Sequence, residues 1–121
     1  MEMTIQQSGL RDWVGWLLGR KQLIEVTNRS MLPLLQPGDR LFLDPFAYRK
    51  EQPQEGDLVV AYDPRQPTVK IIKRVSAVLM NKRYFLSSDN PLEGTDSRAF
   101  GAVPLTAIVG KVVSRATQAD L

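Results

Sequence analysis

The stretch VKIIKRV, residues 69–75, has the pattern of a β-strand in which charged residues are set among apolar ones. Because successive side chains of a strand point to opposite faces, Lys73 shares its face with Ile71 and Val75. A lysine on an apolar face usually extends its ammonium group to water. Burial on such a face can instead lower the pKa of a lysine into the range of a general base. Lys73 is therefore a candidate functional residue.

Other short runs rich in β-branched and aromatic residues surround this strand. Turn signals separate them, among them Pro37-Gly38, which suits a type II turn, and Asn81-Lys82, which suits a hairpin. The predicted strands are 23–27, 40–44, 57–62, 69–79, 83–87 and 107–115. Short strands with frequent turns predict a mostly β fold, a single-domain barrel or sandwich.

Residues 8–21 carry a helical signal, with apolar residues at helical spacing and Ser8 available as the N-cap. Trp13 and Trp16 lie in this amphipathic segment between basic residues. We expect the helix to pack against one end of the barrel. Docking of a partner and contact with a membrane surface are the alternatives, the latter because tryptophan and basic residues are typical of interfacial helices.

A chain of 121 residues is expected to form one domain, here 1–121. Within it we expect the helix 8–21, a β domain over 23–115 and a tail over 116–121. The stretches 48–56 and 90–102 are the two long connections. The apolar residues near the N-terminus are too interrupted for a signal peptide or a spanning helix, so we expect a soluble, cytoplasmic protein.

The composition excludes several chemistries, because the chain has no Cys and no His. Disulfides, zinc knuckles, cysteine nucleophiles and Ser/His/Asp triads are all excluded. The net charge of +3, from 16 Lys and Arg against 13 Asp and Glu, is spread along the chain, so no nucleic-acid partner is expected. Catalysis would depend on Lys, Tyr or carboxylates, and a lysine held neutral can activate a serine hydroxyl.

The turn at 27–33, directly after a predicted strand, holds a candidate serine, Ser30. Pro33 disfavours helical backbone at Leu32, so we expect the chain after Ser30 to leave as an exposed, extended segment.

A series of short motifs contains both candidates and follows one order along the chain. These are SMLP (30–33), PGD (37–39), GDLVV (56–60), IKRV (72–75), DN (89–90) and TDSRAFGAV (95–103). The series resembles that of signal peptidase I and its relatives, the Ser/Lys endopeptidases, over residues 23–115. The resemblance implies the fold of that family, a protein substrate and no metal or other cofactor.

The resemblance also implies roles for individual residues. Ser30 is similar to the nucleophile and Lys73 to the general base, while Met31 and Pro33 shape the nucleophile turn. The oxyanion hole would use the backbone N–H of Ser30 and the side chain of Asn28, which stands where the family has a hydroxyl. An asparagine amide can donate to an oxyanion, so this departure keeps the chemistry possible.

Two further positions, Asp96 and Arg98, match an ion pair that holds the chain near the lysine. The alternative is a surface pair of little energetic consequence. The family hydroxyl that bonds the lysine is replaced by Gly94, and a glycine of the family motif by Ser88. Thr95, Ser88 or a water can orient Lys73 instead, and the sequence does not choose among them.

Within the family, the runs PLLQPGDRLFLDP, IIKRV and SSDNPLEGTDSRAFGAV are most similar to proteases that mature nickel-type superoxide dismutase. This resemblance implies that the substrate is the N-terminal propeptide of the dismutase precursor. Two alternatives stay open. One is a peripheral signal peptidase that cleaves secretory precursors, and the other is a non-catalytic peptide-binding or regulatory β module with a vestigial dyad.

Overall fold

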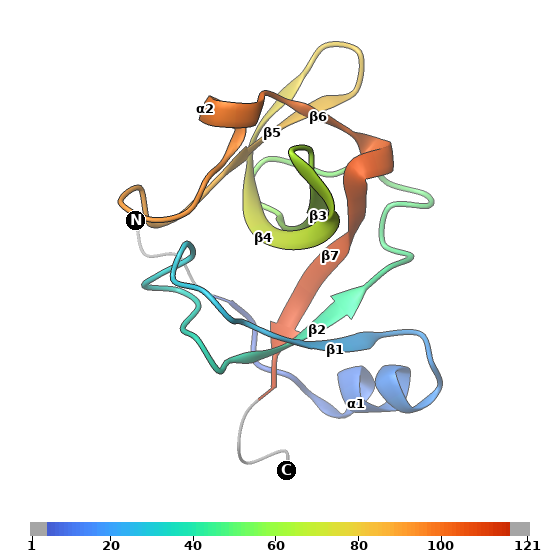
Figure 1. Ribbon diagram of the computed structural model, residues 1–121. Coiled ribbons are helices and arrows are strands. Elements are labelled where there is room, and N and C mark those ends of the chain that lie inside the picture. Colours follow the sequence, from blue (N-terminus) through green and yellow to red (C-terminus); the bar gives the residue numbers. More distant parts are fainter. Residues whose placement is uncertain (1–4, 117–121) are drawn as a thin grey trace.

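The computed structural model describes residues 5–116, which form one seven-stranded sheet, antiparallel throughout, with the order β1-β2-β7-β3-β4-β5-β6 (Figure 1). The strands are β1 (Gln22–Glu25), β2 (Arg40–Asp44), β3 (Leu58–Asp63), β4 (Gln66–Leu79), β5 (Arg83–Ser87), β6 (Val103–Pro104) and β7 (Ile108–Arg115). The helices are α1 (Leu10–Leu17), α2 (Ser97–Phe100) and the 3-10 turn η1 (Leu105–Ala107). The predicted mostly β fold is confirmed.

The sheet coils because β4 is long and strongly curved, so its two halves pack in different parts of the molecule (Figure 1). Two apolar clusters result. One is built on β2, β3 and the turn after β1, and the other on β3, β4 and β5. Each predicted strand run corresponds to an observed strand. Asn81 and Lys82 have φ of 64° and 56°, the left-handed conformation that a tight hairpin requires.

The N-terminal helix is shorter than predicted, and it begins one residue after Gly9, which replaces Ser8 as the N-cap. The carboxylate of Asp12, in the first turn, accepts a hydrogen bond from Gly9 N–H at 3.3 Å, which is the reverse of the contact that a serine cap would make. Trp13 packs edge-on against the buried Phe42, with ring centroids 4.9 Å apart. The helix packs on the sheet through this tryptophan and through Asp12, whose carboxylate accepts from Ser114 Oγ at 2.8 Å.

The rest of the apolar face of α1 stays open to solvent. Its exposed side chains are Leu10, Val14, Trp16 and Leu17, and Leu18 follows directly after the helix. Among the residues that the structure describes, no helix is long and apolar enough to cross a membrane.

The connection 90–102 contains the one-turn helix α2, and β6 begins directly after it. Neither element was predicted, because both are too short to show a periodic pattern. Tertiary contacts hold them, in particular the bond from Leu86 N–H to Ser97 Oγ at 2.8 Å. Of the predicted tail, residues 117–121 lie outside the described residues.

Candidate active site

Ser30 lies in a compact turn after β1 and is 2% exposed. The turn is closed by bonds from Leu32 N–H to Arg29 O at 3.2 Å and from Leu35 N–H to Met31 O at 2.9 Å. The prediction of an exposed, extended segment is therefore wrong. Burial of the Met31 and Leu35 side chains in the first apolar cluster outweighs the local preference of the residue before a proline.

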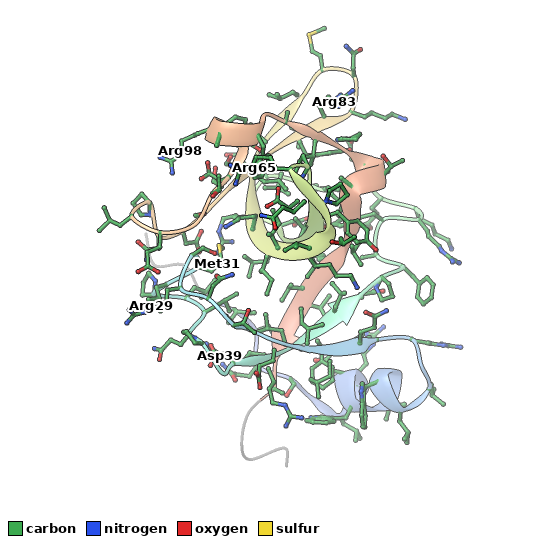
Figure 2. All side chains as sticks on the ribbon, viewed as in Figure 1. Arg29, Met31, Asp39, Arg65, Arg83 and Arg98 are labelled. Atoms are coloured by element: carbon green, nitrogen blue, oxygen red, sulfur yellow. The ribbon has the colours of Figure 1, made fainter. Side chains whose placement is uncertain are left out.

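The residues that follow β5 form hydrogen bonds to the backbone of this turn. Asn90 N–H donates to Ser30 O at 2.8 Å, and the Asn90 side chain donates to Arg29 O at 3.0 Å. The sulfur of Met31, which points toward this segment, accepts from Asp89 N–H at 3.4 Å (Figure 2). Met31 thus joins the turn that holds Ser30 to the segment after β5.

Asp89 is in turn held by Arg74, the neighbour of Lys73 on β4. The two side chains form paired bonds of 2.9 Å each, and both are only 12% exposed. Nothing in the sequence indicated this bidentate pair, which ties the strand of the lysine to the turn of the serine.

Lys73 is 2% exposed and stands opposite Val59 in the register of β3 and β4. Its Nζ donates to Ser88 Oγ at 2.9 Å. Burial lowers the pKa of Lys73, and the negative charges of Asp96 and Asp63 offset only part of that effect. The alternation of β4 placed Lys73 on an apolar face and left its burial open, and the structure shows that the side chain is buried.

Gly94 is the point at which Ser30 and Lys73 meet. A Cβ added to Gly94 would lie 2.5 Å from Ser30 Cβ, 3.1 Å from Lys73 Nζ and 3.3 Å from Ser88 Oγ. The structure thus brings the two predicted catalytic residues side by side, although 43 positions in the printed sequence separate them. The glycine leaves the space that they share.

Asn28 contacts Ser30 with its carbonyl oxygen. Asn28 Oδ1 accepts from Ser30 N–H at 3.1 Å and from Ser30 Oγ at 2.8 Å. The opposite assignment of the amide would set two donors against each other at Ser30 N–H, so the oxygen belongs there. In this state the residue predicted as an oxyanion donor acts as an acceptor.

Asp96 and Arg98 form the predicted ion pair, with Nε and Oδ1 3.0 Å apart. Arg98 is 61% exposed, so the pair itself contributes little stability. The other oxygen of Asp96 accepts from Ser88 N–H at 3.1 Å. Burial raises the pKa of Asp96, but the bonds from Arg98 and Ser88 outweigh burial and hold it below its usual value. Asp96 holds the chain near the lysine mainly through this backbone contact.

A cavity of about 220 Å³ opens next to Asn28, between β1 and β4. Its wall is mostly apolar and includes Ile24, Val26, Met31 and Ile72. Among the described residues, no group of three or more acidic residues is gathered in a way that would hold a metal ion.

A curved antiparallel sheet with a buried lysine beside a buried serine is a framework for peptidase chemistry, and comparison with known proteins gives the family. Residues 18–79, which include Ser30 and Lys73, match the family described as signal peptidase, peptidase S26. The chain belongs to this family.

Related proteins include mitochondrial inner membrane protease subunit 1 of Xenopus tropicalis, 30% identical over 113 residues, which cover 78% of this chain and 68% of that protein. The mitochondrial ATP-independent inner membrane protease subunit 1b of Arabidopsis thaliana is 31% identical over 108 residues, covering 71% of this chain and 64% of that protein. The human subunit 1 is 28% identical over 109 residues, 74% of this chain and 66% of that protein. The chain thus spans about two thirds of the length of these relatives.

Proposed function

We propose that this protein is a serine endopeptidase in which Ser30 is the nucleophile and Lys73 the general base. The observation that carries the proposal is the meeting of the two residues at Gly94 in a chain of the peptidase S26 family. Burial lowers the pKa of Lys73, which raises the fraction of neutral amine that can accept a proton.

The reaction is an acyl transfer in two halves. Lys73 Nζ takes the hydroxyl proton as Ser30 Oγ bonds to the scissile carbonyl carbon. The protonated lysine then gives that proton to the leaving amine as the C–N bond breaks. A water attacks the acyl ester, transfers a proton to Lys73, and the proton returns to Ser30 Oγ as the acid product leaves.

The negative charge on the carbonyl oxygen requires donors, and the backbone N–H of Ser30 is one of them. Because Asn28 Oδ1 contacts that N–H in this state, substrate must displace it. Rotation of the Asn28 amide frees the N–H and turns Nδ2 toward the oxyanion. Replacement of Asn28 by Ala is then expected to lower kcat more than it changes KM.

The substrate binds as an extended peptide along the exposed edge of β1, with a side chain in the neighbouring cavity. β1 is an edge strand, so its free backbone groups can pair with a peptide. The apolar wall of the cavity accepts a small or medium apolar side chain near the cleavage site.

The substrate that we propose is the N-terminal propeptide of nickel-type superoxide dismutase, cleaved in the cytoplasm. The support is the resemblance of PLLQPGDRLFLDP and SSDNPLEGTDSRAFGAV to the proteases that mature this enzyme. Cleavage would free an amine for nickel in the product, so the protease would need no metal of its own.

The test is to incubate the protein with the dismutase precursor and to read the new N-terminus by mass spectrometry. We expect one cut with the native chain and none with Ser30→Ala or Lys73→Met, both of which should remain folded. Cleavage by either variant would end the dyad proposal. No cut of the precursor, together with labelling of Ser30 by a serine-directed acylating probe, would reject this substrate and keep the peptidase.

A second candidate, peripheral cleavage of membrane-delivered precursors, is favoured by the open apolar face of α1. The relatives are named as inner membrane proteases. Cleavage of a secretory precursor on vesicles, lost when Leu17 is changed to Glu, would favour this candidate over the dismutase propeptide.

A further inference from the structure

Lys73 is held by a single side chain in the described part of the chain. The only hydrogen bond that its Nζ makes among residues 5–116 is the one to Ser88 Oγ at 2.9 Å, and no carboxylate lies within ion-pair distance of it. A lysine side chain has many rotamers, so a buried amine without a charged partner needs a fixed acceptor to hold one position. The hydroxyl of Ser88 is that acceptor.

Ser88 is itself fixed on both sides. Its N–H donates to Asp96 Oδ2 at 3.1 Å, and the next residue, Asp89, is bound by Arg74 at 2.9 Å. Because Arg74 follows Lys73 on β4, one ion pair sets the spacing between the lysine strand and the serine. The Ser88 hydroxyl is thus presented by a rigid segment.

Position 94 has no room to supply the hydroxyl instead. The backbone at Gly94 has φ of 81°, and a Cβ there would meet Ser30 Cβ at 2.5 Å, closer than side-chain carbons approach each other. Thr95 makes no hydrogen bond to Lys73 within the described chain. Of the two side chains that the sequence left open, Ser88 contacts the amine and Thr95 does not.

We propose that Ser88 is the positioning residue of this site, which directs the Lys73 amine toward Ser30. This inference rests on the proposed function and adds a residue to it. A neutral amine has two N–H bonds and one lone pair. When one N–H is donated to Ser88 Oγ, rotation about the Cε–Nζ bond is restricted, and the lone pair can be kept toward the Ser30 hydroxyl.

The first test compares Ser88→Ala, Ser88→Thr and a matched control, Ser87→Ala. Ser87 is the adjacent residue, and its Oγ donates to Ser76 at 2.7 Å rather than to the lysine. We expect Ser88→Ala to lower kcat by about 10- to 100-fold, as loss of an orienting partner typically does, with KM unchanged. Ser88→Thr keeps the hydroxyl and should restore most of kcat, and Ser87→Ala should match the native enzyme. Native kcat in Ser88→Ala, or an equal loss in Ser87→Ala, would overturn the proposal.

The second test needs no cleavage, so it separates this proposal from the proposed function. With lysine side chains labelled by ¹³C, the Lys73 signal is assigned by its absence in Lys73→Met and titrated by NMR. Ser88 accepts from the ammonium form, so its removal should shift the titration of Lys73 to lower pH, and Ser87→Ala should leave it in place. If Lys73 titrates identically in the native chain and in Ser88→Ala, Ser88 does not hold the amine, whether or not the protein cleaves any substrate.

Discussion

Two lysines of this chain, Lys21 after α1 and Lys73 on β4, each lie near a serine and an aspartate, but the contacts differ. Lys21 Nζ reaches Asp12 Oδ1 directly at 2.6 Å. The other oxygen of Asp12 accepts from Ser114 Oγ at 2.8 Å. Burial raises the pKa of Asp12, but the bonds from Lys21, Ser114 and the Gly9 N–H outweigh it and keep that pKa below its usual value.

At the second lysine the aspartate is engaged elsewhere. Asp96 is occupied by Arg98 and by the Ser88 N–H, and within residues 5–116 the hydrogen bond of Lys73 Nζ goes to the Ser88 hydroxyl alone. Its buried charge is therefore poorly compensated, and the pKa of Lys73 falls. The same residue types build a structural ion pair at one end of the sheet and a candidate base in its interior.

The largest expected effect comes from replacing the two lysines by methionine and measuring kcat on a cleaved substrate. Lys73→Met should reduce kcat by about 10⁴- to 10⁶-fold, because the serine loses its proton acceptor. Lys21→Met should leave kcat per folded molecule unchanged, because Lys21 lies outside the site. A comparable loss of kcat in both variants would contradict the assignment of a catalytic role to Lys73 and a structural role to Lys21.

A second comparison uses two glycines that have the same positive φ. Gly94 and Gly101 both have φ of 81°. A Cβ added at Gly94 would meet Ser30 and Lys73, whereas a Cβ added at Gly101 would have no atom within 4 Å. Gly94→Ala should therefore lower kcat by about 100-fold through displaced reacting groups. Gly101→Ala should lower the stability of the fold through backbone strain and leave kcat unchanged. Equal kcat in the two variants, measured with the same substrate, would contradict the crowding at Gly94.

The sequence predicted the strands and the apolar face on which Lys73 lies, because alternation and turn residues are local signals. It missed the contacts that turn these residues into a site, since these join distant positions. Ser88 meets Lys73 across the β4–β5 hairpin, and Ser114 meets Asp12 from the far end of the chain.

The turn after β1 shows the same limit. The rule for the residue before Pro33 predicted an extended chain, but burial of Met31 and Leu35 in a shared cluster decided the conformation. The family motifs pointed to residues that the structure brings together, yet they did not reveal which end of the Asn28 amide faces Ser30.

A smaller effect is expected in the stability of Lys21→Met. Loss of the ammonium group leaves Asp12 largely buried with only neutral hydrogen-bond donors, at side-chain exposure of 13%. We expect the free energy of unfolding to fall by about 1 to 3 kcal/mol, as measured by urea denaturation at pH 7. Lys21→Arg, which keeps the charge, is the control and should recover part of the loss. A native-like midpoint for Lys21→Met would show that the pair contributes no net stability.

The last effect concerns the pH dependence of stability. Replacing Lys73 by methionine should stabilise the fold at pH 7, whereas replacing Lys21 should destabilise it. The unfolded state binds the lysine proton up to its ordinary pKa of 10.5, whereas the folded state releases it at lower pH because burial lowers that pKa. Between these two values the unfolded state holds more protons, so stability rises with pH by at most about 1.4 kcal/mol per pH unit. Lys73→Met lacks this term. Urea denaturation from pH 7 to 10 should show the variant more stable than the native chain at pH 7, with the difference narrowing as pH rises. A constant difference would mean that Lys73 keeps its ordinary pKa in the fold, and that its burial does not change its protonation.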